Sequence, residues 1–123
     1  MCDVLIVDDD PETSAILSSA IALNGYRPEW ADGGSRALSL FGDGLRPSLV
    51  LLDLSMPGMS GIDVALRMKA DPELNGIPIV FASGQRLSSS AARVLGAREF
   101  LRKPFRLSEV MNIVKRYLEE PSA

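Results

Sequence analysis

The sequence has no histidine and a single cysteine, Cys2, among its 123 residues. Without histidine the chain cannot build a serine–histidine triad, an imidazole general base or most zinc sites, and one cysteine permits no internal disulfide. Any chemistry must therefore use carboxylates, hydroxyls, lysine and arginine. Nothing near Cys2 resembles a redox motif, so we interpret it as an incidental thiol near the chain end.

A long apolar run is also missing. No uninterrupted apolar stretch approaches the roughly 18 residues that a bilayer-spanning helix needs, and the N-terminus lacks the basic segment of a signal peptide. We therefore expect a cytoplasmic chain with no membrane partner. The length, with 46% apolar and 24% charged residues, predicts a single globular domain over residues 1–123. Its ordered core should cover about 3–118, followed by a short tail at 119–123.

Short apolar runs typical of buried strands alternate along the chain with segments of helical spacing. We expect strands over residues 4–7, 26–31, 49–52, 77–82 and 99–102, a fourth helix over 87–95 and a last helix with Ser108 as its cap. Pro28 cannot donate a ladder hydrogen bond, which places the second strand at a sheet edge. Five such alternations predict an α/β fold, a parallel sheet with helices on both faces.

The segment after the first strand predicts the start of a helix. Asp10 is a suitable N-cap, and Pro11 suits the first helical position. The helix should present an apolar stripe of Ile16, Ala20 and Leu23, with Leu17 and Ile21 beside it.

Polar residues follow four of the five predicted strands. The carboxyl ends of parallel strands meet at one edge of a sheet, where the functional crevice lies, so we expect these side chains to converge. Three crowded carboxylates repel one another unless a cation neutralises them, and hard oxygen ligands in an open site favour Mg²⁺. Each residue alone has an ordinary structural explanation as a cap or turn, and only their coincidence favours a site. The set is Asp8, Asp9, Asp53, Ser83 and Lys103.

Four motifs carry a family resemblance that covers essentially the whole chain. They are Leu5-Ile6-Val7-Asp8-Asp9-Asp10, the run from Leu51 to Gly61, Ala82-Ser83-Gly84, and Phe100-Leu101-Arg102-Lys103-Pro104-Phe105. With these motifs the sequence resembles a receiver domain of two-component response regulators. The resemblance implies a flavodoxin-like, doubly wound three-layer sandwich with strand order 2-1-3-4-5 and five helices.

The resemblance also implies a role for each strand-end residue. Asp53 would be the phosphoacceptor, and Asp9 and Asp53 would ligate Mg²⁺ directly. Asp8 would act mostly through metal-bound water, and Ser55 would add its backbone carbonyl. Ser83 and Lys103 would contact phosphoryl oxygens, which fits the need of phosphoryl transfer for neutralised charge. Ser83 and Phe100 would form the switch, although Phe100 is equally interpreted as an ordinary core residue.

The expected partners follow from the missing histidine. A chain without histidine cannot be a phosphohistidine donor, so the phosphoryl group must come from a histidine kinase, a histidine phosphotransfer protein or a small phosphodonor. The output would be a downstream protein or a fused output domain, and the chain would be a monomer or a phosphorylation-dependent dimer. A net charge of −3 without a recognition motif argues against direct nucleic-acid binding.

The charge is unevenly distributed along the chain. Residues 1–82 carry 5 basic and 12 acidic side chains, whereas residues 83–123 carry 8 basic and 4 acidic ones. The basic excess fits a solvated face, or alternatively a docking face for an acidic partner or a charge-paired dimer. The 20 positions from Ser83 to Lys103 are few for this family, so we expect a truncated fourth helix or leading loop.

Two other functions compete with the receiver interpretation. Asp8-Asp9-Asp10 also fits the Asp-x-Asp nucleophile motif of a haloacid-dehalogenase-like phosphatase, although Glu12 departs from that pattern and the chain is short for that fold. A phosphorylation-independent adaptor is the other alternative, against which the intact acidic set argues. Whether the chain is a stand-alone regulator or the excised receiver of a longer protein stays open.

Overall fold

A computed structural model describes residues 2–84 and 89–119 of the chain. Within these ranges five strands form one parallel sheet in the order β2-β1-β3-β4-β5, which confirms the predicted α/β fold. Pro28 is the first residue of the edge strand β2, where its missing N–H is tolerated. The strands are β1 (Val4–Val7), β2 (Pro28–Ala31), β3 (Leu49–Asp53), β4 (Ile79–Ser83) and β5 (Ala97–Arg102).

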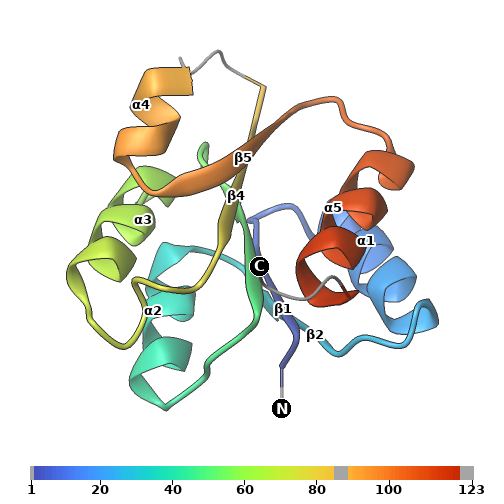
Figure 1. The fold of residues 1–123 in the computed structure, drawn as a ribbon, viewed down its shortest axis with the longest axis horizontal. Coiled ribbons are helices and arrows are strands. Elements are labelled where there is room, and N and C mark those ends of the chain that lie inside the picture. Colours follow the sequence, from blue (N-terminus) through green and yellow to red (C-terminus); the bar gives the residue numbers. More distant parts are fainter. Residues whose placement is uncertain (1, 85–88, 120–123) are drawn as a thin grey trace.

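Helices cover both faces of the sheet and complete three layers (Figure 1). In the figure α1 and α5 lie on one side, and α2, α3 and α4 lie on the other. In the part of the chain that is described, no helix is long and apolar enough to cross a bilayer. The helices are α1 (Pro11–Leu23), α2 (Gly34–Gly42), α3 (Gly61–Ala70), α4 (Ser89–Val94) and α5 (Leu107–Glu119). Residues 87 and 88 of the predicted fourth helix lie outside the described residues.

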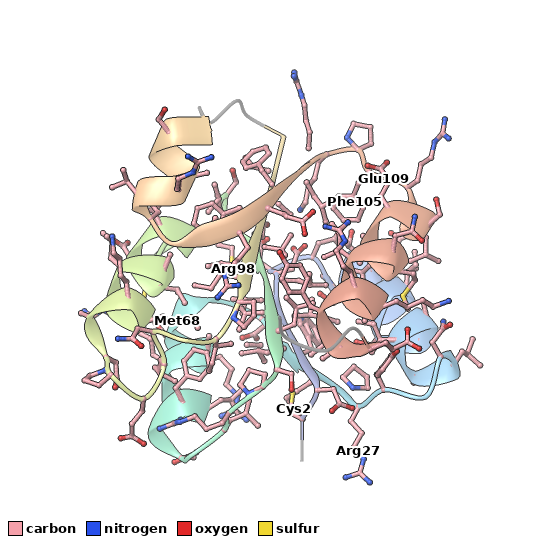
Figure 2. The ribbon with its side chains drawn as sticks, in the orientation of Figure 1. Cys2, Arg27, Met68, Arg98, Phe105 and Glu109 are labelled. Carbon is pink, nitrogen blue, oxygen red and sulfur yellow. The ribbon has the colours of Figure 1, made fainter. Side chains whose placement is uncertain are left out.

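The sheet divides the core into two apolar clusters. One joins the sheet to α2 and α3 through residues such as Phe81 and Met68, and the other joins it to α1 and α5 through residues such as Ile21 and Val114. Figure 2 shows Met68 on the first side and Phe105 beside α5 on the second. Every residue of β1 and β3 is buried, which explains why their sequences are continuously apolar rather than alternating.

The predicted apolar stripe of α1 was wrong for Ile16 and Leu23. The helix buries Ser14, Leu17 and Ile21, whereas the side chain of Ile16 is 54% exposed and that of Leu23 is 87% exposed. The helix carries apolar residues on more than one side, so spacing alone does not choose between overlapping stripes. The first buried position of the helix is Ser14, so the buried stripe is not a continuous apolar pattern in the sequence.

The last helix begins two residues earlier than a cap at Ser108 would place it. Ser108 was expected to cap it, but α5 starts at Leu107, and Arg106 precedes it. The backbone N–H of Arg106 donates to Glu109 Oε1 at 3.0 Å, which is one half of a capping box. A glutamate three residues along therefore satisfies the helix start where a serine cap was expected.

Candidate functional site

The carboxyl ends of the strands bring the predicted polar residues to one edge of the sheet. Asp8 directly follows β1, Asp53 ends β3, Ser83 ends β4 and Lys103 directly follows β5. One carboxylate oxygen from each of Asp8, Asp9 and Asp53 lies within 4.8 Å of the other two. The predicted convergence of these side chains is therefore present in the fold.

One lysine serves two buried carboxylates. The Lys103 Nζ lies 3.3 Å from Asp8 Oδ2 and 3.4 Å from Asp53 Oδ2. Burial alone would lower the pKa of Lys103, but the two carboxylates raise it above its ordinary value, so the ammonium stays charged. The backbone fixes the lysine as well, because its N–H donates to the Ser83 carbonyl at 2.8 Å.

The second oxygen of each buried aspartate accepts a backbone hydrogen bond from two residues along. Asp10 N donates to Asp8 Oδ1 at 2.9 Å, and Ser55 N donates to Asp53 Oδ1 at 3.1 Å. Burial raises the pKa of Asp53 and the nearby Asp8 adds to that shift, against the opposing effects of the Ser55 N–H and Lys103. With three carboxylates facing one ammonium, the site keeps an excess of negative charge.

These residues fit a magnesium ion. Carboxylate oxygens are its preferred ligands, and an octahedral ion with bonds of about 2.1 Å holds opposite ligands about 4.2 Å apart. Each of the three carboxylates has an oxygen within 4.8 Å of the other two, so all three can reach one ion. Asp9 and Ser55 are exposed while Asp8 and Asp53 are buried, so one side of the site is open to the waters that Mg²⁺ retains.

A glycine supports the backbone of Asp53. Gly61 begins α3, and a Cβ built on it would lie 2.2 Å from the Asp53 carbonyl oxygen and 2.8 Å from Leu54 Cα. Only a residue without a side chain lets α3 pack this closely behind the end of β3. In the sequence, Gly61 stood out only as the end of a motif, and no role was predicted for it.

A tryptophan contacts the other acidic turn. The Trp30 indole Nε1 donates to the backbone carbonyl of Asp8 at 2.8 Å. From the sequence, Trp30 was predicted only to be part of an edge strand. A signal was available, since this is the one tryptophan of the chain and it lies next to the last residue of β2.

The two residues of the predicted switch lie on neighbouring strands. Ser83 is buried at the end of β4, and Phe100 is half-buried on β5, opposite Phe81 in register. Phe100 packs against the core cluster on the α2 and α3 side. This placement suits both a core residue and a switch, so the switch stays a prediction.

The C-terminal part of the fold carries an excess of basic side chains. Arg116 Nη1 forms an ion pair with Glu99 Oε2 at 2.6 Å between α5 and β5. Arg86 lies outside the described residues, and a docking role for this surface stays a prediction. Within residues 89–119 the exposed basic residues are Arg93, Arg98, Arg102, Arg106, Lys115 and Arg116.

The sequence matches the model of the response regulator receiver domain over residues 4–115. Two-component response regulator ORR7 of Oryza sativa subsp. japonica is 33% identical over 118 residues, which cover 94% of this chain and 56% of that protein. This chain thus spans about half the length of that relative.

Solved structures share the fold. Response regulator TrrA of Thermotoga maritima, in complex with Mg²⁺–BeF, is 30% identical with a TM-score of 0.81, covering 96% of this chain and 100% of that one. The non-phosphorylated HemR receiver domain of Leptospira biflexa is 29% identical with a TM-score of 0.86, covering 100% and 98% of the two chains.

Proposed function

Because the chain belongs to the response regulator receiver domain family, we propose that Asp53 is its phosphoacceptor and that Lys103 stabilises the phosphoryl group. The observation that carries this assignment is the shared lysine, placed 3.4 Å from Asp53 Oδ2 beside two further carboxylates. Phosphoryl transfer depends on positioning and charge neutralisation, and these are what this arrangement supplies.

Asp8, Asp9, Asp53 and the Ser55 backbone carbonyl would hold Mg²⁺, with Asp8 acting mostly through metal-bound water. When bound, the ion neutralises charge on the phosphoryl oxygens and on the carboxylates around it. The complex of TrrA with Mg²⁺–BeF supports this choice of ion.

In the proposed reaction an oxygen of Asp53 attacks the phosphorus atom of the donor. A new O–P bond forms as the bond from phosphorus to the donor's leaving atom breaks, and the leaving group takes up the electron pair. Ser55 N–H already holds Asp53 Oδ1, so Oδ2, the oxygen nearer Lys103, is the one we assign as nucleophile. Lys103 and the Ser83 hydroxyl would then contact phosphoryl oxygens.

The donor would be a histidine kinase or a histidine phosphotransfer protein. An apolar groove of about 510 Å³ opens beside the acidic site, between α1 and the start of α5, with Lys103 in its lining. A donor bound in this groove would cover the exposed side chains of Ile16 of α1 and Leu107 of α5. It would approach Asp53 beside Lys103. The other lining residues are Thr13, Leu17, Pro104 and Phe105.

We propose the remaining properties on the same basis. Residues 1–123 would form one receiver domain that acts in the cytoplasm as a monomer or a phosphorylation-dependent dimer. Its only catalysis would be its own phosphorylation and dephosphorylation, and a downstream protein or fused output domain would read its state. The chain itself would not contact nucleic acid.

The test is incubation with acetyl phosphate and Mg²⁺ followed by mass spectrometry of the intact protein. We expect the wild type to gain one phosphoryl group, Asp53→Asn to gain none and Asp43→Asn, which changes an exposed aspartate at the end of α2, to behave as the wild type. Equal labelling of Asp53→Asn would contradict the assignment. Steady hydrolysis of a phosphate monoester that survives loss of Asp53 but not of Asp8 would favour the phosphatase alternative.

A further inference from the structure

Trp30 lies on the sheet edge and reaches into the turn that carries two of the three carboxylates. Its residue is 40% exposed, and its backbone pairs with Ile6 of β1 in the register of the sheet. From there the indole Nε1 donates to the Asp8 carbonyl oxygen at 2.8 Å. This contact joins an edge residue directly to the backbone of the acidic site.

The hydrogen bond replaces one that the backbone ladder no longer supplies. Asp8 N still donates to the Ala31 carbonyl at 3.1 Å, but Ala31 is the last residue of β2. The Asp8 carbonyl lies one step beyond β1, where it accepts from the Trp30 side chain. The Asp8 backbone is therefore held to β2 through both its N–H and its C=O.

Holding the Asp8 carbonyl in place also sets the direction of the backbone at Asp9. The Asp8 carbonyl and the Asp9 nitrogen belong to one planar peptide group, so a bond to the first constrains the second. The Asp8 side chain is buried and bonded to Lys103, whereas Asp9 is exposed, so its position depends more on the backbone that precedes it. Metal sites gain affinity when groups behind the ligands orient them in advance.

We propose that Trp30 is a positioning residue for Mg²⁺, one that orients the Asp8–Asp9 peptide and so places the Asp9 carboxylate. The proposal rests on the proposed function, because it takes the acidic site to be the magnesium site of a receiver. It assigns the tryptophan no contact with the ion or with the phosphoryl group.

The first test is the affinity of Trp30→Phe for Mg²⁺, measured by calorimetry without a phosphodonor. Phenylalanine keeps an aromatic ring at the edge and removes the donor, and one hydrogen bond corresponds to about a fivefold loss of affinity. The matched control is Tyr26→Phe, which removes a side-chain hydroxyl near Glu119, beside the other end of β2, and should leave the affinity unchanged. Urea midpoints of both variants separate weak binding from loss of fold.

The second test uses the wild type alone. A single tryptophan gives one indole N–H resonance, and Mg²⁺ should shift it with the same midpoint that calorimetry gives. Phosphorylation of Trp30→Phe should recover at saturating Mg²⁺, which a damaged fold would not allow.

Three outcomes would overturn the proposal. The first is an unchanged Mg²⁺ affinity in folded Trp30→Phe, and the second is a wild-type indole resonance that does not shift when Mg²⁺ is added. The third is phosphorylation of Trp30→Phe that stays slow at saturating Mg²⁺. Each of these leaves the labelling of Asp53 in the wild type intact. A wild type that binds no Mg²⁺ and gains no phosphoryl group would instead remove the proposed function together with this inference.

Discussion

The turn after β1 and the turn after β3 begin in the same way. Each opens with a buried aspartate whose Oδ1 accepts the backbone N–H two residues along, and whose Oδ2 faces the Nζ of Lys103, at 3.3 Å for Asp8 and 3.4 Å for Asp53. The two carboxylates are thus nearly equivalent in their nearest contacts. The difference between the turns lies in what surrounds those contacts.

The first turn is short and polar, whereas the second is longer and closely packed from behind. After Asp8 the chain reaches Pro11 of α1 at once, and Trp30 holds the turn with a hydrogen bond from an exposed edge. After Asp53 a loop runs to Ser60, and Gly61 presses against the strand end. The two aspartates therefore need not have the same role, although their nearest contacts are nearly equivalent. The turn after β1 contributes an additional, exposed carboxylate, Asp9. The turn after β3 holds Asp53 on a backbone against which α3 packs closely.

We expect the largest effect from Gly61→Ala, which disturbs the packing of α3 against the turn after β3 and does not touch the turn after β1. A Cβ would overlap the Asp53 carbonyl, which is backbone and cannot rotate away, so we expect a loss of about 2–3 kcal/mol in the free energy of unfolding. The rate of labelling by acetyl phosphate should fall too, since Asp53 must move. Urea unfolding and intact-mass kinetics measure the two effects.

Gly76→Ala is the matched control, because a Cβ there meets nothing within 4 Å. It should leave both measurements close to the wild type. A Gly61→Ala variant as stable and as quickly labelled as Gly76→Ala would mean that the second turn is no more rigid than the first.

The next effect concerns the contact that both turns share. Lys103→Met removes the ammonium between two buried carboxylates and should cost about 1–2 kcal/mol at pH 7, less than for a fully buried pair because the lysine side chain is 29% exposed. The pKa of Lys103 is raised in the fold, so its stabilisation is complete below its ordinary pKa of 10.5 and is lost as pH rises through the folded value. Urea unfolding across the pH range measures this profile.

Two variants check that interpretation. Lys115→Met removes an exposed lysine of α5 and should change stability little. Asp53→Asn should act in the opposite direction at pH 7. The pKa of Asp53 is raised by burial, so the fold favours the uncharged form and the charged one destabilises it above the ordinary value of 3.8. A gain that persisted unchanged at low pH would contradict the assigned cause.

The fold and most of the site were predictable from the sequence for one physical reason. Buried parallel strands are continuously apolar, so the residue that ends each run stands out, as Asp8 and Asp53 do. Parallel topology then brings those ends together without further information. The strand order came from the family resemblance, and the structure confirms it.

What escaped prediction depends on contacts between elements. The Trp30 indole crosses from β2 to the turn after β1. Gly61 matters because it has no Cβ, which lets α3 approach the Asp53 backbone closely. The buried face of α1 was missed because packing, not spacing, chose Leu17 over Ile16. None of these is encoded in a run of neighbouring residues.

The smallest expected effects lie at the helix starts, where the two turns again differ. Asp10 caps α1, with Oδ1 accepting from Glu12 N at 3.1 Å and Oδ2 from the Thr13 hydroxyl at 2.6 Å. Ser60 caps α3 in a capping box with Asp63. Ser60→Ala should cost about 1 kcal/mol at pH 7, as is typical of an N-cap.

Asp10→Asn should separate the charge of the first cap from its hydrogen bonds. The Thr13 hydroxyl lowers the pKa of Asp10, so the cap adds stability above the ordinary pKa of 3.8 and loses it as pH falls through the lower folded value. Asparagine still caps, which keeps the variant near the wild type at pH 7 while removing this acid-sensitive part. Urea unfolding of both proteins between pH 2 and 7 should therefore give curves that agree near pH 7 and diverge in acid, where only the wild type loses this stabilisation. Parallel curves would show that the charge of Asp10 does not contribute to this cap.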